Sequence, residues 1–451
     1  MKLKLALAFL VGSTSLMADD NFLSSVKRTK IGEYEVVWLE DKKFPSFVAS
    51  IYFNDGALRD SVEGLTQVTF DQLSSGTSKE NEKELAEYFD FYGASINHSV
   101  THEYSIFTMR GLTKDIDPVV GKVCELFNDA QYPQFELDSY IARKKSNLRN
   151  LVTSHSSLAD RIFRNLSLSG TPFNTDVDGN LKSLDKIKAT DLKSRLTQMG
   201  KAKKTIYLAG PSEVKKVAEV ISKNCKWSQE TEITPVQISK PKEQTAIYLV
   251  PVPGANQAQI RIGRYLNREE ASGKEDQFQF LSGFLGGGFT SKLIQELRVK
   301  RGLTYSAGAY VSMQRDYGRA GVVTFSKNET TSEVVALIRN IFSEMEHPQR
   351  IDEKEFKHQQ SHQIGGHAFD FEQVNSLLAR IISYDHQKKD LSEMLNFPDK
   401  VAKFTPAILS RSSKEVYPWE KMTIVIVGDE SLVKSLAKIR PVKIIDYKKF
   451  L

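Results

Sequence analysis

The chain has 451 residues, of which 40% are hydrophobic and 26% are charged, and its formal net charge is +6. This length exceeds what one ordinary hydrophobic core takes up, so we expect a globular protein of two or more domains. Basic residues alternate with acidic ones and form no block, which argues against nucleic acid as a partner.

The first eighteen residues have the pattern of a secretory signal peptide. Lys2 and Lys4 precede a short apolar run, and small residues follow up to Ala18. The run is too short to span a bilayer as a helix, and no later segment reaches transmembrane length. We therefore expect residues 1–18 to be removed on export and the protein to act in the periplasm, or outside the cell if it is secreted. Loss of the two lysines lowers the net charge to about +4.

The chain up to residue 225 alternates strand and helix patterns. Strands are predicted at 34–40, 46–53, 94–103, 104–112 and 203–210, and helices at 63–75, 79–93, 117–130, 135–168, 188–200 and 212–224. Cys124 lies in an apolar helical stretch, so it is predicted to be a buried core residue and not the disulfide partner of Cys225, the only other cysteine.

A polar stretch with two prolines, residues 226–245, is the predicted linker. After it the succession of elements recurs. Strands are predicted at 247–251 and 258–266, from 303 to about 326, and at 422–428. Helices are predicted at 275–286, 290–300, 331–346, about 352–388 and 406–416. The recurrence predicts an α+β protein with two homologous domains, 19–225 and 246–451, that face one another. Each is expected to be a mostly antiparallel sheet with helices on one face.

Residues 284–306 form the most distinctive motif of the second domain. Gly286, Gly287 and Gly288 precede a predicted helix, and Arg298 and Tyr305 follow at a spacing of seven residues. Glycines allow close approach of another chain, and backbone N–H groups at a helix start suit carbonyl or anionic groups. The motif is suited to holding a peptide, and the glycines favour a substrate-binding loop over a simple tight turn.

Several ordered stretches resemble the insulinase/pitrilysin metallopeptidase family, in its short branch that includes mitochondrial processing peptidase. They include NDGALRDSVEGLTQVTFDQLSSGTSKE, ELAEYFDFYGASIN and FLGGGFTSKLIQELRVKRGLTYSAGAYVS. The resemblance implies two domains that form half of a clam-shaped shell. It also implies a zinc site in the first domain, with an inverted His-x-x-Glu-His motif and a further Glu ligand roughly 75 residues later.

The zinc motif is degenerate in this chain. Alignment with the family places Gln67 and Asp71 at the two histidines and Phe70 at the general-base Glu. Asp71 could ligate a metal, but Gln67 is a poor zinc ligand and Phe70 cannot accept a proton. No Asp or Glu occurs between Ser139 and Ala159, where the last ligand is expected. We therefore expect no metal and no other cofactor in this chain.

The motif of the second domain is intact. In the family, an Arg and a Tyr at this spacing bind the substrate backbone and polarise the scissile carbonyl, and they match Arg298 and Tyr305. The resemblance thus implies a heterodimer in which a paralogous partner with His-x-x-Glu-His carries the zinc. This chain would supply substrate contacts for proteolysis of an extended peptide, which could pair with the strand near 95–103. The alternative is a non-enzymatic structural or chaperone-like, peptide-binding protein of the same family.

Four histidines are candidate metal ligands by their spacing. His98 and His102 are too far apart along one strand for a single ion, so they are predicted to be surface or peptide-facing residues. His358 and His362 are one helical turn apart, but the family has no site there, and a solvated helix face is the preferred interpretation.

Overall fold

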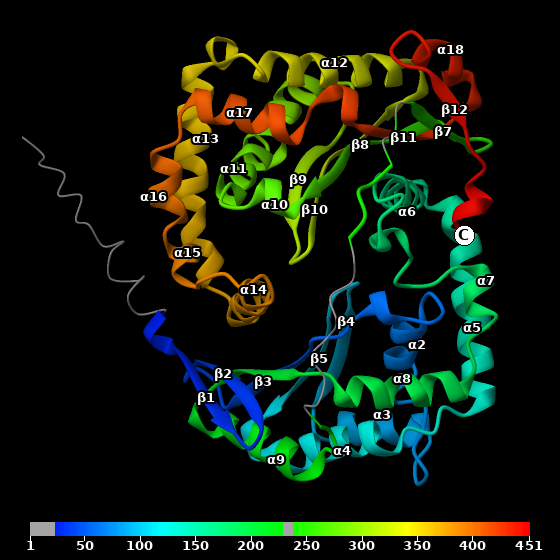
Figure 1. Ribbon diagram of the computed structural model, residues 1–451, viewed down its shortest axis with the longest axis vertical. Coiled ribbons are helices and arrows are strands. Elements are labelled where there is room, and N and C mark those ends of the chain that lie inside the picture. Colours follow the sequence, from blue (N-terminus) through cyan, green and yellow to red (C-terminus); the bar gives the residue numbers. More distant parts are fainter. Residues whose placement is uncertain (1–22, 229–237, 243, 245) are drawn as a thin grey trace, which may run out of the picture.

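The computed structural model describes residues 23–451, apart from 229–237, 243 and 245. It has an α+β fold with two six-stranded sheets, one in each half of the chain (Figure 1). The predicted signal peptide lies outside the described residues, and so does most of the predicted linker. Within the part that is described, no helix has the length and apolarity needed to cross a membrane.

The first sheet has the strand order β1-β2-β6-β3-β5-β4. All its neighbouring pairs are antiparallel except β2 with β6, which is parallel. The alternating apolar residues of these strands face a core that is closed by helices of the same half. The strands are β1 (Val26–Ile31), β2 (Tyr34–Glu40), β3 (Ser46–Phe53), β4 (Ser95–Val100), β5 (Ser105–Leu112) and β6 (Lys204–Gly210).

The second sheet repeats this plan in the order β12-β7-β11-β8-β10-β9. Strands β7, β11 and β12 pair in parallel, and the other pairs are antiparallel. In both sheets the last two strands of the order come from a hairpin that leaves one member, β4 or β9, at the edge. The strands are β7 (Ile247–Pro251), β8 (Gln257–Asn267), β9 (Ala307–Met313), β10 (Tyr317–Lys327), β11 (Thr423–Gly428) and β12 (Val442–Ile444).

Amphipathic helices close the core on one face of each sheet. The first half contributes α2 (Leu65–Asp71), α3 (Glu82–Phe91), α4 (Ile116–Asp129), α5 (Gln134–Asn150), α6 (His155–Ser167), α7 (Leu181–Leu184), α8 (Ala189–Lys201) and α9 (Lys215–Asn224). The second contributes α10 (Arg268–Ala271), α11 (Glu275–Gly286), α12 (Thr331–Met345), α13 (Glu353–Gly366), α14 (Val374–His386), α15 (Ser392–Leu395), α16 (Phe397–Ala402), α17 (Pro406–Val416) and α18 (Val433–Leu436).

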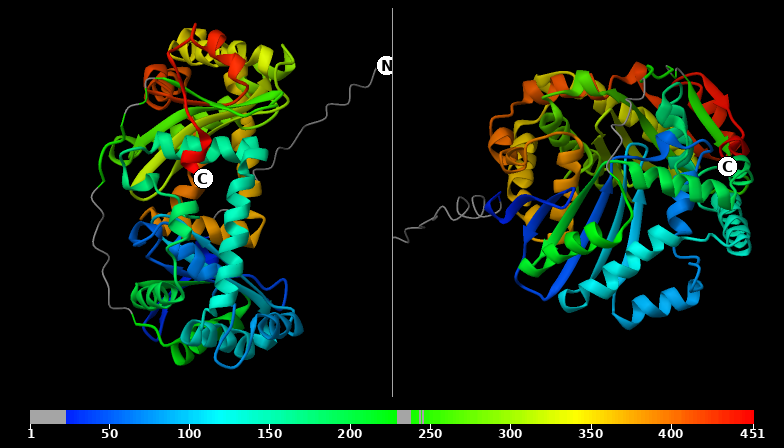
Figure 2. Two further views of the ribbon diagram at one scale, coloured as in Figure 1. Left: turned by 90° about the vertical axis from the view of Figure 1, so that its right-hand side faces the viewer. Right: turned by 60° about the horizontal axis from the view of Figure 1, so that its bottom comes forward.

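Each half also donates a helix to the sheet of the other half, which the sequence did not reveal. Helix α6 packs its Leu158 and Ile162 against β7 and β11 of the second sheet. Helix α14 packs Leu378 and Ile381 against β2, β3 and β6 of the first. The long predicted helices 135–168 and 352–388 are therefore each broken in two, because their C-terminal parts cross to the opposite half. Figure 2 shows the two halves of the chain from two further sides.

The prediction that Cys124 is an unpaired core residue was wrong. Cys124 on α4 and Cys225 at the end of α9 form a disulfide across 101 residues of sequence. Both cysteines are buried, because α4 and α9 lie side by side on the first sheet. The apolar stretch around Cys124 thus reported its burial correctly but gave no information on its partner.

Candidate functional site

Helix α2 carries the three positions of the degenerate zinc motif. It is held at its start by Asp60, which accepts a hydrogen bond from the Thr66 backbone N–H at 3.0 Å, and by the buried Arg195 of α8, which donates to Thr66 Oγ1 at 2.7 Å. Burial raises the pKa of Asp60 to about 6, although Thr66 and Arg195 act against this rise. The helix is therefore fixed by a polar network beneath it, not by a side-chain cap.

Gln67 and Asp71 lie one turn apart on the same face of α2, and Gln67 lines a cavity that residues of the second half also line. Phe70 points into the core instead. Its exposed fraction is 3%, and its ring stacks on the His98 ring at a centroid distance of 5.5 Å and meets the Phe53 ring at 5.9 Å. The position that corresponds to the general base has become a core aromatic.

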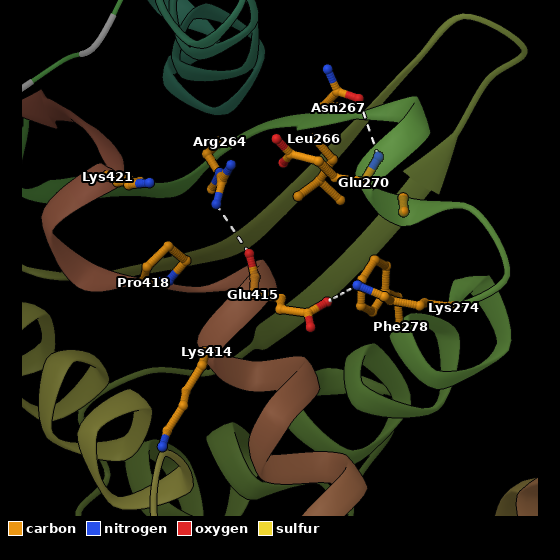
Figure 3. Close-up of a pocket in the computed structure, with 11 residues that line it drawn as sticks. Arg264, Leu266, Asn267, Glu270, Lys274, Phe278, Lys414, Glu415, Pro418 and Lys421 are labelled. Atoms are coloured by element: carbon orange, nitrogen blue, oxygen red, sulfur yellow. Dashed lines mark hydrogen bonds and ion pairs between the residues drawn. The ribbon is translucent and has the colours of Figure 1, made fainter.

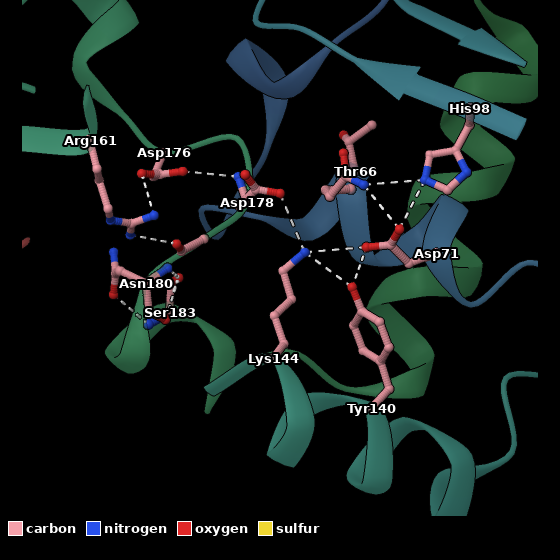
Figure 4. A network of polar contacts seen from close by, with 12 residues as sticks. Thr66, Asp71, His98, Tyr140, Lys144, Arg161, Asp176, Asp178, Asn180 and Ser183 are labelled. Carbon is pink, nitrogen blue, oxygen red and sulfur yellow. Dashed lines mark hydrogen bonds and ion pairs between the residues drawn. The ribbon is translucent and has the colours of Figure 1, made fainter. Parts of the chain in front are cut away.

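Asp71 is the centre of a compact polar network (Figure 4). Its Oδ1 lies 2.9 Å from His98 Nε2 and accepts from Gln67 Nε2 at 3.0 Å. Its Oδ2 accepts a hydrogen bond from the Tyr140 hydroxyl and forms an ion pair of 3.2 Å with Lys144 Nζ. Tyr140 and Lys144 come from one face of α5, so this network joins α2, β4 and α5.

The network holds Asp71 ionised. Burial acts to raise the pKa of this carboxyl, but the hydrogen bond from His98, the charge of Lys144 and the bond from Tyr140 outweigh it and lower the pKa to about 2. The same carboxylate, together with burial, raises the pKa of the Tyr140 phenol well above its usual range. Tyr140 is therefore a hydrogen-bond donor, and Asp71 is an acceptor with both oxygens engaged.

These residues do not fit a zinc ion. Asp71 and His98 are the only metal-binding types in the network, and the ammonium of Lys144 lies where a cation would have to bind. No group of three or more His, Cys, Asp or Glu suited to a metal occurs in the part of the chain that the structure describes. Lys144 follows Asp71 by 73 residues, close to the spacing at which the resemblance implies the last Glu ligand.

Arg298 and Tyr305 are adjacent in space. Arg298 lies on a π-helix, Ile294–Val299, and its guanidinium stacks over the Tyr305 ring at 4.4 Å and the Phe289 ring at 5.4 Å. Tyr305 is 72% exposed and lies two residues before β9, not within the strand as expected. Among the described residues, no hydrogen bond, ion pair or ring contact joins this cluster to the Gln67–Asp71 network.

Each of the three glycines has a structural reason at its position. Gly286 ends α11 where a Cβ atom would lie 1.9 Å from the backbone nitrogen of Ala309 on β9, and a Cβ on Gly287 would meet the backbone of Gly283. Gly288 adopts a φ of 144°, which favours glycine. The run therefore permits a tight exit from α11, and it also precedes the helical segment with Ile294–Val299, as the sequence suggested. A role in substrate binding stays a prediction.

Two connected cavities lie between the halves, beside α2. One of about 320 Å³ is lined by Gln67 and the end of β4 on one side and by Tyr310, Tyr317 and Arg319 of β9 and β10 on the other. The second, of about 660 Å³, shares Tyr310 and Arg319 and extends to Lys144. The degenerate motif thus faces a real cavity, and the edge strand β4 ends at it, as the predicted peptide-pairing strand requires.

The comparisons with known proteins agree with this geometry. Residues 200–362 match a family model described as "Peptidase M16 inactive domain". The matched stretch is less than half of the chain and is similar to that domain. A crystal structure of an M16 inactive-domain protein from Pseudomonas fluorescens covers 90% of this chain and 98% of its own length, with a TM-score of 0.78 and 19% identity. This likeness confirms the predicted fold, and the match of residues 200–362 agrees with the family resemblance found in the sequence.

Relatives of this chain differ in the activity that their names state. The "non-peptidase homolog YmxG" of Helicobacter pylori is 21% identical over 68% of this chain and 72% of its own length. An "uncharacterized zinc protease" of Rickettsia bellii is 22% identical over 66% and 71%, respectively. The structure of the periplasmic protease PqqL from Escherichia coli matches 91% of this chain with a TM-score of 0.69 and 13% identity, but only 46% of PqqL is covered.

The structure shows where the four candidate histidines lie. His98 belongs to the Asp71 network, but His102 is not a surface residue. It is buried, with Nε2 3.0 Å from the Thr175 carbonyl oxygen, and burial lowers its pKa. β4 ends at Val100, so the two histidines do not share a strand face. His358 and His362 lie on the exposed side of α13, as predicted.

The sequence analysis did not identify four residues beside α2 that line the cavities or belong to the Asp71 network: Tyr140, Lys144, Tyr310 and Arg319. Lys144 could have been identified from the sequence, because it lies close to the position where the family resemblance implies the last Glu ligand. A further cavity, of about 340 Å³ between α10 and α17, is away from this site (Figure 3). Its Arg264 and Lys274 already bind Glu415, which indicates a structural role.

Proposed function

We propose that this chain is the non-zinc subunit of a two-subunit M16 peptidase and that it acts in the periplasm. In this proposal a paralogous chain with His-x-x-Glu-His holds the zinc and the general base. This chain holds the extended peptide and presents Arg298 and Tyr305, with the Gly286–Gly288 loop, to the scissile carbonyl. Neither chain would cleave peptides alone.

The observation that carries the proposal is the ion pair of Lys144 with Asp71 at the degenerate motif. An ammonium fixed at 3.2 Å from the carboxylate disfavours a second cation there, yet the cavity beside it is open to the second half. The exposed Arg298–Tyr305 stack is not committed to any ion pair among the described residues, so both side chains are available to a ligand. The chain thus keeps groups that bind peptides and lacks groups that activate water.

Two further observations support the partnership and the location. The chain aligns with less than half of PqqL, a periplasmic protease, so a second chain of similar size is needed to match the size of that enzyme. The Cys124–Cys225 disulfide is of the kind that persists in oxidising compartments such as the periplasm. Both observations agree with the export signal inferred from residues 1–18.

Reconstitution tests the proposal. The signal-cleaved chain and its zinc-bearing paralogue are purified separately and together and assayed on a quenched fluorescent peptide. We expect cleavage only by the mixture, and we expect a chelator to abolish it. Chelator-sensitive cleavage by this chain alone would contradict the proposal.

A chaperone-like, peptide-binding protein is the second candidate. Two observations favour binding without cleavage. The cavity is lined by Arg319, whose Nε has no hydrogen-bond partner among the described residues, and the Helicobacter pylori relative is named a non-peptidase homolog. In that case the chain binds unfolded peptides, and no paralogue converts binding into cleavage. Substitution of Arg298 then leaves every activity unchanged.

A further inference from the structure

The face of the second sheet that looks toward α6 carries a second Arg–Tyr pair, Tyr310 and Arg319. In the β9–β10 ladder Arg319 lies opposite Ser312 and Tyr310 lies opposite Gly321. The two side chains are therefore diagonal neighbours on one face of the sheet. The Tyr310 ring covers Gly321 so closely that a Cβ atom there would lie 2.9 Å from it.

Arg319 is a cation without a counterion among the residues that the structure describes. Its guanidinium lies 5.5 Å from the centre of the Phe163 ring of α6, and its Nε is buried with no hydrogen-bond partner. Across the described residues, no hydrogen bond or ion pair involves the Arg319 guanidinium or the Tyr310 hydroxyl. An unsatisfied buried donor is unfavourable, so its persistence calls for a ligand.

The surroundings favour a negatively charged ligand. Arg319 and Tyr310 line both cavities beside α2. Arg164 and Lys144 also lie in the walls but are paired with Asp176 and Asp71, respectively, whereas no ion pair of Arg319 is found among the described residues. The acidic side chains of the walls are already occupied: Asp160 binds Arg261 at 2.5 Å, and Asp178 lies 3.5 Å from Lys144. A planar guanidinium beside a phenol is the donor set that a carboxylate accepts.

We propose that Arg319 and Tyr310 form a subsite that binds a carboxylate group of the peptide in the cavity, either its C-terminus or an Asp or Glu side chain. This inference rests on the proposed peptide-binding role of the cavity, but not on cleavage or on a partner. The guanidinium forms charge-assisted hydrogen bonds with the carboxylate, and the phenol donates one more. Phe163 keeps the guanidinium in place beneath the ligand.

Binding to the isolated chain tests the subsite. Fluorescence anisotropy is measured with one extended peptide in three forms: unmodified, with an amidated C-terminus, and with its single Glu replaced by Gln. The three forms separate the two sources of the carboxylate. We expect one of the two changes to weaken binding on the order of tenfold, and rising salt to weaken binding of the unmodified peptide.

Matched variants complete the experiment. R319Q should abolish the discrimination between the forms, Y310F should reduce it, and R319K should restore part of it. R339Q, which removes an exposed arginine of α12, should bind like the wild type. Equal binding of all three peptides, or an R319Q variant that still discriminates, overturns the subsite.

The outcomes separate this proposal from the proposed function. Carboxylate-dependent binding without any cleavage by the reconstituted pair leaves the subsite in place and refutes only the peptidase role. Cleavage with no dependence on Arg319 refutes only the subsite. Absence of peptide binding by the wild type refutes both. Thermal unfolding of R319Q is expected to change little, because among the described residues the substitution removes a ring contact with Phe163 but no hydrogen bond or ion pair.

Discussion

Lys144 Nζ lies 3.2 Å from Asp71 Oδ2, and the two side chains are 14% and 19% exposed. A side-chain cation thus lies against the Asp71 carboxylate, beside the helix where the family resemblance implies a zinc motif. The same carboxylate accepts from Tyr140 and contacts His98, so the degenerate motif is a satisfied structural network. The network joins α2, β4 and α5 without a metal ligand set.

The Asp71 network predicts a specific pH dependence of stability. The folded pKa of Asp71, about 2, is below its ordinary value of 3.8, so the stabilisation is present above about pH 4 and is lost as the pH falls toward 2. We expect Asp71→Asn to cost about 2 kcal/mol of unfolding free energy near neutral pH and much less near pH 2.5. Urea denaturation at both pH values measures this difference. Glu372→Gln, which removes an exposed carboxylate, is the control, and an equal cost for Asp71→Asn at both pH values contradicts the account.

Restoring the ligands should restore metal binding. In Q67H/D71H/K144E, two histidines one helical turn apart on α2 face a Glu on α5, which is a His₂Glu set suited to zinc. We expect the triple variant to bind about one zinc ion per chain by elemental analysis, and the wild type and Q67H/D71H, which keeps the lysine, to bind none. Stoichiometric zinc in the wild type would show that Lys144 does not replace the metal.

Glu103 and His386 join the two halves and should control their cooperativity. Glu103 of the first half lies 2.6 Å from His386 Nε2 on α14 and accepts the backbone N–H groups of Arg315 and Asp316. Both side chains are almost fully buried. Glu103→Ala leaves these donors unpaired, so we expect a loss of about 3 kcal/mol and a broader or two-step unfolding curve. The exposed Glu372→Ala serves as the control, and a single unshifted transition in Glu103→Ala rules out the clamp.

The disulfide should be detectable and stabilising. Denatured protein purified without reductant should show no reactive thiols, since Cys124 and Cys225 are paired and are the only cysteines. Reduction should lower the unfolding free energy by about 4 kcal/mol, because the bond closes a long loop. Two free thiols per chain in material exported by the cell would contradict the pairing.

Much of the fold could be predicted because the local signals are strong. The strands at 34–40 and 46–53 and the helix at 406–416 begin and end where alternation or helical periodicity indicated. The exchange of α6 and α14 could not be predicted, since an amphipathic helix reveals which face is buried but not against which sheet. For the same reason, Cys124 was recognised as buried but not as paired.

The candidate site was predicted where a residue's chemistry alone was informative. Gln67 and Phe70 could be excluded as a zinc ligand and a base from their side chains. Arg298 and Tyr305 were named from a family motif, but the stacking of their side chains was not predicted. Arg319 and Tyr310 carry no such motif, and their significance comes from missing partners in three dimensions. Absence of a counterion cannot be read from a sequence.

The most direct test of the account is the effect of Arg298 on turnover in the reconstituted pair. Arg298→Ala is compared with Arg301→Ala, which removes an exposed arginine from the same segment that pairs only with Glu296. We predict that Arg298→Ala lowers kcat by two orders of magnitude or so with little change in KM, as expected for loss of an oxyanion contact, and that Arg301→Ala leaves kcat unchanged. Equal turnover of the two variants would contradict the claim that this chain completes a peptidase site in its partner.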